Sequence, residues 1–309
     1  MGEPGNQAVQ VGNVLAAVVT FCPEGGFARN LEALRRQVAN VLLIDNSPAN
    51  RSGLEFTARA SGCQFRRNPG NLGVAKALNQ AAEAALDGGF EWLAMFDQDS
   101  LVPEGAIADL LAVYEAHPAR ERIAVMAMSH RDRATGLPYL RGSDVLDEGP
   151  EWRSVRATIT SGSLVRREVL EKVGPFDEAL FIDGVDHDFC LRCRRAGYLV
   201  IEGRRPVLEH SMGSVSLHRL LGRTIACTNH SPTRRYYMTR NSLELSARHV
   251  TSDPLWALRN VTHLVDSSLS ALAFEDRRGE KTKAMIQGVW HFVTRQFGPR
   301  LPAARDVGD

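Results

Sequence analysis

Two carboxylates one residue apart follow an apolar segment of the chain. Trp92–Phe96 is extended in character, and Asp97, Gln98 and Asp99 come directly after it. Because side chains alternate along an extended chain, Asp97 and Asp99 can face one site beyond the strand end. Carboxylate oxygens select Mg²⁺ or Mn²⁺, which keep positions open for phosphate oxygens and water. The pair predicts a divalent metal that holds a diphosphate, and the alternative is a turn that caps a helix over 103–107.

A second acidic group precedes a predicted helix in the other half of the chain. Asp186 and Asp188 lie where an acidic loop runs into a helix that ends near Gly197. A carboxylate held near an acceptor hydroxyl can remove its proton as a general base. The alternative is structural, because the helix dipole favours carboxylates in a first turn. Both interpretations stay open at this point.

The elements that must position these residues alternate between strand and helix. Apolar runs predict strands over 14–21, 41–44, 63–67 and 92–96, and helical spacing predicts a helix over 74–85. This order is typical of an α/β fold, with a parallel sheet and helices on both faces. Ligands of such sheets bind at the carboxyl ends of the strands.

Other polar residues and glycines also follow predicted strands. Asp45 could hold ribose hydroxyls or a base edge, and the loop with Gly70 and Gly73 would let phosphates approach the backbone and the following helix N-terminus. The alternatives are a turn residue and a loop-to-helix connection. His210 ends a later strand, where it is either a structural histidine or an extra metal ligand that favours Mn²⁺.

Composition excludes several classes of protein. The 309 residues are 44% hydrophobic and 24% charged, which is ordinary for a globular protein. A net charge of +1 gives no general attraction to nucleic acid. The five scattered cysteines argue for a reducing compartment, and we expect neither a signal sequence nor a membrane span. We therefore predict a cytoplasmic protein or one that is peripheral on the inner face of the cytoplasmic membrane.

The ordered set of motifs resembles the inverting glycosyltransferases of family 2, which have the GT-A fold. The resemblance spans about 14–246 and rests on Asp45, Gly70-Asn71-Leu72-Gly73, Asp97-Gln98-Asp99, Val185-Asp186 and His210. The segments 180–186, 208–213 and 230–241 resemble the bacterial rhamnosyltransferase branch, which extends O-antigen, other cell-envelope polysaccharides or rhamnolipids.

The resemblance implies roles in donor binding. Asp45 would contact the nucleoside, Asp99 would bind the Mg²⁺ or Mn²⁺ ion, and Asp97 would contact ribose or metal. Arg240 could add cationic hydrogen bonds to the phosphates. The alternative for Arg240 is an ordinary solvated helix start.

The resemblance also implies a catalytic base. Asp186 matches the aspartate of the family's Glu-Asp motif, and Asp183 and Asp188 are fallback candidates. Val185 stands at the glutamate position, which puts in doubt any acceptor contact that the glutamate would make.

The expected reaction is inverting transfer of L-rhamnose from dTDP-L-rhamnose to a hydroxyl of a glycan or glycolipid acceptor. The alternatives are another nucleotide sugar or a non-catalytic protein that binds sugar nucleotides. A nucleotidylyltransferase would need a basic residue in the loop over 21–26, and a dinucleotide oxidoreductase would need G-x-G-x-x-G after a strand. The sequence has neither.

We expect four segments. A flexible N-terminus over 1–13 precedes a GT-A catalytic domain over 14–246, with a nucleotide-sugar half over 14–149 and an acceptor half over 150–246. A C-terminal helical segment covers 247–309.

The C-terminal segment is predicted to make two kinds of contact. Leu255, Leu258, Val261, Val265, Leu269 and Leu272 recur at helical spacing, and we expect this face to pack on the catalytic domain. The basic stretch over 276–305 carries Trp290 and could rest on anionic lipid, where each basic residue adds about 1 kcal/mol. The alternative is a plain solvated helix.

Overall fold

The computed structural model describes residues 11–23, 26–48, 53–132, 136, 144–210, 216–220 and 223–300, and the side chains of 12, 210, 220 and 223–226 are not described. The chain divides into two compact units. Unit 1 comprises Met1–Leu72, Lys76–Phe176 and Phe189–Ser211, and unit 2 comprises Gly73–Ala75, Asp177–Asp188 and Met212–Asp309. The boundaries between these units differ from the boundaries expected after residues 149 and 246.

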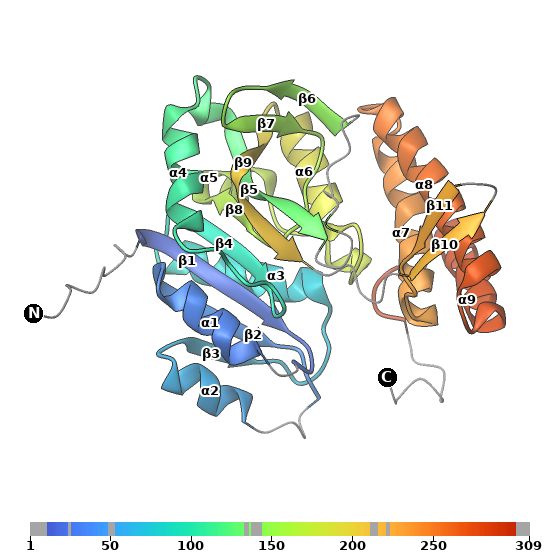
Figure 1. The fold of residues 1–309 in the computed structure, drawn as a ribbon, viewed down its shortest axis with the longest axis horizontal. Helices are drawn as coiled ribbons and strands as arrows, with labels where there is room; N and C mark the ends of the chain where they lie inside the picture. Colours follow the sequence, from blue (N-terminus) through green and yellow to red (C-terminus); the bar gives the residue numbers. More distant parts are fainter. Residues whose placement is uncertain are drawn as a thin grey trace, which may run out of the picture. The chain divides into compact units, whose positions relative to one another are not determined.

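Unit 1 is built on a mixed sheet flanked by helices (Figure 1). Its strands are β1 (Val11–Thr20), β2 (Val38–Asp45), β3 (Gln64–Arg67), β4 (Trp92–Asp97), β5 (Ile123–Asp132), β6 (Val145–Glu148), β7 (Trp152–Val155), β8 (Ser163–Arg166) and β9 (Leu199–His210). Its helices are α1 (Phe27–Arg35), α2 (Leu54–Ala60), α3 (Val74–Asp87), α4 (Ala106–Ala116), α5 (Arg167–Val173) and α6 (Val185–Arg195), of which α3 and α6 each begin in unit 2. Short 3-10 helices lie at Arg120–Arg122 in unit 1 and at Glu178–Leu180 in unit 2.

Strand direction brings the chemistry-bearing strand ends to one edge of the sheet. In the described residues the strand order is β3-β2-β1-β4-β8-β5-β9-β7-β6. β1 runs parallel to β2 and β4, β3 runs parallel to β2, and β5 runs parallel to β9. β8 is antiparallel to both β4 and β5, so β5 and β9 again share the direction of β1. The predicted α/β fold is confirmed, with an antiparallel strand inserted in the sheet.

The central strands are buried on both faces. Val14, Ala16 and Ala17 in β1 and Leu93 and Ala94 in β4 are each 0% exposed. Continuous apolar runs suit strands that helices cover from both sides. Such strands leave their ends as the place for polar side chains.

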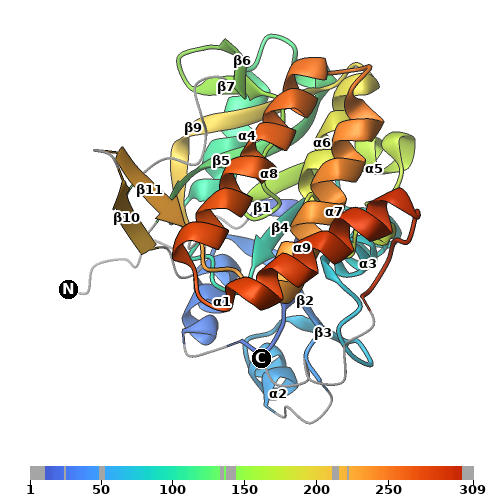
Figure 2. The same cartoon turned by 90° about the vertical axis from the view of Figure 1, so that its right-hand side faces the viewer.

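In the described residues, unit 2 combines a β-hairpin with the helices that follow it in the chain (Figure 2). Its elements are β10 (Ser216–Leu220), β11 (Arg223–Cys227), α7 (Pro232–His249), α8 (Pro254–Phe274) and α9 (Arg278–Val293). Ser231 and Asp253 cap α7 and α8 by accepting hydrogen bonds from backbone N–H groups, and a proline follows each cap. This order is favoured because the proline at the first helical position has no N–H to leave unsatisfied. None of the helices in the described ranges is long and apolar enough to cross a membrane.

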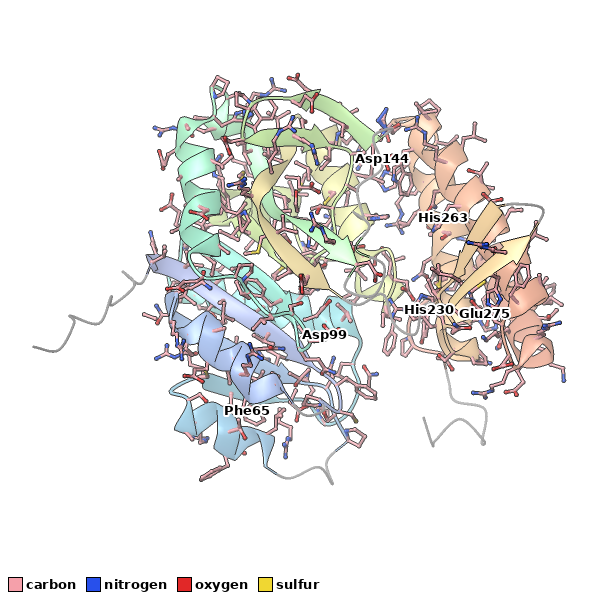
Figure 3. All side chains as sticks on the ribbon, viewed as in Figure 1. Phe65, Asp99, Asp144, His230, His263 and Glu275 are labelled. Atoms are coloured by element: carbon pink, nitrogen blue, oxygen red, sulfur yellow. The ribbon has the colours of Figure 1, made fainter. Side chains whose placement is uncertain are left out.

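A buried ion cluster joins the start of α7 to α9. Glu275, labelled in Figure 3, is 1% exposed and accepts hydrogen bonds from Arg235 at 2.5 Å and Lys281 at 2.7 Å. The backbone N–H of Asn229 adds a third at 3.0 Å. Burial would raise the pKa of Glu275, but the Lys281 hydrogen bond and the Arg235 charge outweigh burial and lower it. The carboxylate is therefore held ionised.

The predicted apolar face of α8 is on the outside. Its exposed members are Leu255, Leu258, Val265, Leu269 and Leu272, which are 38–61% exposed. The inward face instead buries Trp256, Ala257 and Ala271. Within unit 2, α8 therefore packs through its other side, and the leucines and Val265 that were expected to pack are exposed.

The close packing of α7 on α9 can be tested at two glycines of α9. A Cβ on Gly288 would lie 2.8 Å from the carbonyl oxygen of Tyr236 and 3.0 Å from Cβ of Thr239, whereas Gly279 has open space. We expect Gly288→Ala to lower the free energy of unfolding by about 1–3 kcal/mol through overpacking. Gly279→Ala should instead raise it by up to about 1 kcal/mol by reducing unfolded-state entropy. Urea denaturation measures both, and an unchanged Gly288→Ala variant would contradict the close helix contact.

Candidate functional site

Asp45 lies at the carboxyl end of β2 and is 1% exposed. Its Oδ1 accepts hydrogen bonds from Thr20 Oγ1 at 3.3 Å and from the Ser47 backbone N–H at 2.9 Å. Its Oδ2 pairs with the Arg67 guanidinium at 3.3 Å, and the Arg67 side chain is 31% exposed. The sequence did not single out Arg67. The arrangement gives a carboxylate of fixed orientation, with a cation beside it at the ends of β2 and β3.

Buried amides hold the loop that follows β3. Asn68 Nδ2 donates to Asn46 Oδ1 at 2.8 Å, and Gln80 Nε2 on α3 donates to Asn68 Oδ1 at 2.8 Å. All three residues are less than 5% exposed. Buried amide networks of this kind are costly unless paired, so they fix the loop conformation. The alternation of side chains and the turn residues of the sequence do not predict this amide network, because Gln80 lies on α3, beyond the loop that it holds.

The two predicted loop glycines differ in their surroundings. Gly70 has nothing within 4 Å of a Cβ position, which leaves open space beside the backbone. Gly73 has φ +86, and a Cβ there would lie 2.6 Å from both the ring and the carbonyl oxygen of Phe181. The Ala75 N–H at the start of α3 donates to the same carbonyl at 3.3 Å. Gly73 is thus required by a contact within the protein, which no sequence pattern indicates.

Asp97 is the last residue of β4 and Asp99 follows just beyond it, so both lie at the strand end as predicted. Asp97 is partly buried and Asp99 is exposed, and Gln98 between them is braced because its Oε1 accepts the Phe21 N–H at 2.7 Å. Ser161 Oγ accepts the Asp97 N–H at 3.1 Å and lies 2.6 Å from Ser100 Oγ. Figure 3 labels Asp99 at this end of the sheet. Hydrogen bonds from the backbone and from side chains therefore fix the turn at which Asp99 is exposed.

His210 lies near the same turn along the backbone. It ends β9 opposite Asp132 of β5, and the adjacent Glu209 forms an isolated bridge with Leu101, two residues after Asp99. Asp132 is 1% exposed and is another acidic residue at a strand end, which the sequence analysis missed. The backbone thus brings His210 toward the aspartate turn, while its side chain is outside the described set.

The donor set fits a divalent metal that shares its coordination with a substrate. Among the described side chains, no group of three or more His, Cys, Asp or Glu could hold a metal ion alone. Asp97 and Asp99 supply two carboxylates at an exposed turn. Mg²⁺ is commonly held by one or two carboxylates, with phosphates and water completing its shell. The residues present therefore suit a metal that arrives with a diphosphate.

Asp183 in unit 2 has an unusual backbone and an unusual charge environment. Its φ is +63, in the left-handed region that aspartate visits more readily than most residues. Oδ1 accepts from Arg234 Nε at 3.2 Å, and Oδ2 is buried without a hydrogen-bond partner. Burial raises the pKa of Asp183, and the Asp186 charge raises it further against the opposing charge of Arg234.

Arg240 and Asn241 clamp the segment that contains Asp183. Arg240 is 1% exposed, and its nitrogens donate to the carbonyl oxygens of Ala179, Leu180 and Gly298 at 2.8–3.1 Å. Asn241 Nδ2 lies within 2.7–2.9 Å of the carbonyl oxygens of Leu180, Ile182 and Asp183. This geometry differs from the expected phosphate contact of Arg240, because its donors are used within the protein. We infer that Arg240 is a positioning residue.

Asp186 and Asp188 share the first turn of α6 but have different surroundings. Asp188 is 0% exposed, and its Oδ1 accepts from Arg248 at 2.9 Å and lies 3.3 Å from His249 Nε2. Asp186 is partly exposed, and its Oδ1 accepts the His187 N–H at 2.8 Å. Val185, at the glutamate position of the family motif, is 4% exposed. The geometry thus favours a structural role for Asp188 and leaves Asp186 able to meet a substrate.

Solved glycosyltransferase structures share this fold. S. aureus TarS 1–349 in complex with UDP matches with a TM-score of 0.55 at 15% identity, covering 91% of this chain and 80% of that chain. Mannosyltransferase PcManGT from Pyrobaculum calidifontis, in complex with GDP-Man and Mn²⁺, gives 0.52 at 13% identity, covering 92% and 88%. GalNAc-T7 with UDP, GalNAc and Mn²⁺ gives 0.54 at 13% identity; 95% of this chain is covered, but it spans only 59% of GalNAc-T7. At these identities the likeness concerns the fold alone.

Sequence comparison adds the family. Residues 17–174 match the model of the Glycosyl transferase family 2. The chain is also 34% identical over 286 residues to the dTDP-rhamnosyl transferase RfbF of Shigella flexneri, covering 89% of this chain and 93% of that protein. With a GT-A-like sheet and carboxylates at its strand ends, the chain belongs to glycosyltransferase family 2.

Proposed function

We propose that this enzyme transfers L-rhamnose from dTDP-L-rhamnose, with inversion, to a hydroxyl of a cell-envelope glycan or glycolipid. The similarity to a dTDP-rhamnosyl transferase over nearly the whole chain carries the choice of sugar. The aspartates at the carboxyl ends of β2 and β4 support a nucleotide diphosphate donor. A family 2 transferase that uses another nucleotide sugar is the alternative.

Donor binding is assigned to the carboxyl edge of unit 1. Asp45, held by Thr20 and Arg67, would accept hydrogen bonds from the nucleoside. Asp97 and Asp99 would hold Mg²⁺ or Mn²⁺ against the diphosphate, with His210 as an additional ligand. When bound, the metal supplies positive charge that stabilises the departing diphosphate without a proton transfer.

Asp186 is assigned the role of base in a single displacement. It would remove the proton of the acceptor hydroxyl as that oxygen forms a bond to the anomeric carbon. The bond from this carbon to the diphosphate breaks at the same time, dTDP leaves, and a β-linked donor gives an α-linked product. Partial exposure of Asp186 supports this assignment, because the fully buried Asp188 is already paired with Arg248.

A lipid-linked acceptor would place the enzyme on the cytoplasmic face of the membrane. Exposed apolar residues on α9 support a peripheral contact, since Ile286, Trp290 and Val293 are 61–64% exposed. Lys283 and Arg278 are exposed on the same helix and would favour anionic lipid.

The donor assignment predicts selective stabilisation. Because a ligand that binds only the folded state stabilises it by RT ln(1 + [L]/Kd), dTDP-L-rhamnose at 100 times its Kd should add about 2.7 kcal/mol. Thermal-shift measurements with Mn²⁺ should show this effect for dTDP-L-rhamnose and a smaller one for UDP- and GDP-sugars. A preference for UDP- or GDP-sugars would keep the family and refute the rhamnosyl donor.

The metal assignment predicts that chelation stops transfer. We expect EDTA to abolish turnover and Mg²⁺ or Mn²⁺ to restore it. Asp99→Asn should weaken metal affinity at least about tenfold, because even loss of an outer-shell partner costs 10- to 100-fold. Asp109→Asn, an exposed aspartate on α4, is the matched control and should change neither. Transfer that survives EDTA would remove the metal from the proposal.

The base assignment predicts a loss in kcat with donor binding preserved. Asp186→Asn should lower kcat by about 10²- to 10⁴-fold, the usual contribution of a positioned base. Glu178→Gln removes an exposed carboxylate of the same segment and should leave kcat unchanged.

Two outcomes would move the role of base to Asp183. The first is full turnover of Asp186→Asn together with an inactive Asp183→Asn variant. The second is a wild-type rate that, as the pH is lowered, begins to fall at a pH above the range in which an ordinary aspartate takes up its proton. Burial raises the pKa of Asp183, so this base would be protonated at that higher pH. Asp188→Asn should mainly lower the melting temperature, since it weakens the buried pair with Arg248.

A further inference from the structure

The outer face of α8 carries a heptad pattern. Leu255, Leu258, Thr262, Val265, Leu269 and Leu272 are all exposed, and they are separated alternately by three and four residues. The most exposed of the apolar ones, Leu258 and Leu269, are 61% and 60% exposed. Spacing of this kind places one straight seam of side chains along a helix and is typical of helices that pair lengthwise.

The other side of α8 is already used within unit 2. Trp256, Ala257 and Ala271 are buried, and Asn260 Nδ2 donates to the Ser242 carbonyl oxygen on α7 at 2.9 Å. The packing of unit 2 therefore leaves much of the apolar surface of the seam uncovered. A helix with apolar residues on both sides is ordinarily covered on both sides.

From this seam we infer that α8 pairs with α8 of a second copy of the chain, in antiparallel orientation about a two-fold axis. In that register Leu255 meets Leu272 of the second copy, Leu258 meets Leu269, and Thr262 meets Val265. Each contact occurs twice, as two-fold symmetry requires. The six seam positions are thus self-complementary.

Charges beside the seam favour the antiparallel orientation. Arg259 and Asp266 occupy the same flanking heptad position, and in antiparallel pairs this position faces its counterpart on the other helix. Arg259 would therefore lie near Asp266 of the second copy, twice in the dimer. In a parallel pair the corresponding neighbours would be Pro254 and Val261, which carry no charge.

The same charges argue against an anionic membrane as the occupant of this face. The charges of Arg259 and Asp266 cancel along α8, so the seam has no basic excess. Binding to anionic lipid gains from each Lys or Arg near the surface. A second helix of the same kind needs no such excess.

Sedimentation of the full chain over a range of concentrations tests the inference. The wild type should show a monomer–dimer equilibrium, and Leu258→Glu should abolish it by burying an acidic group against Leu269 of the second copy. Val293→Glu, which adds the same charge to an exposed apolar residue of α9, should leave the dimer intact. Circular dichroism and donor-induced thermal shifts confirm that each variant is folded.

A charge exchange tests the orientation independently. Arg259→Asp or Asp266→Arg alone should weaken association several-fold, because like charges then face each other. The double variant should recover it, because the pair is restored with the signs exchanged.

Three results would overturn the inference. They are a wild type that stays monomeric at all concentrations, a dimer that survives Leu258→Glu, and a double charge exchange no better than the single changes. Monomers whose binding to anionic vesicles is lost in Leu258→Glu would assign the seam to lipid instead.

Discussion

Burial of the central strands on both faces constrains where unit 1 can carry chemistry. The interiors of β1 and β4 are fully buried and apolar, so an ion there would lose its hydration without a partner. The strand ends are free of this restriction, and the shared direction of β2, β4, β5 and β9 brings their ends to one edge. Asp45, Asp97, Asp132 and His210 all occupy this edge. The polar chemistry of the unit is thus a consequence of how its apolar strands are covered.

In unit 2, hydrogen bonds from α7 hold an irregular acidic segment that contains Asp183. The backbone at Asp183 is left-handed, and its carbonyl neighbours are bonded by Arg240 and Asn241 from α7. Adjacent arginine and asparagine side chains from one rigid helix replace the hydrogen bonds that a regular element would supply. The backbone at Asp183 is therefore held in place although it lies between a 3-10 helix and α6 and belongs to neither.

Local rules predicted much of this molecule. The strands and the aspartates at their ends were visible in the sequence because burial and alternation act over a few residues. Ser161 was missed because it lies 64 residues from its partner Asp97 along the chain. Gln80 was missed because it reaches Asn68 from α3, on the other side of the loop. Arg240 was expected at the donor phosphates, and no local pattern indicates that its acceptors are carbonyls about 60 residues earlier. The apolar spacing of α8 was recognised, but spacing alone does not reveal which side of a helix the rest of the unit covers.

The buried Glu275 cluster has a consequence for how the protein loses its structure in acid. Because the folded state lowers the pKa of this carboxyl, its contribution to stability is present above the unfolded pKa and disappears as pH falls through the folded value. The hydrophobic core cluster of unit 1 consists of apolar side chains, which have no charge to lose in acid. Acid should therefore loosen the α7–α9 helices before the sheet, through a partly folded species in which the chain no longer behaves as a single cooperative system.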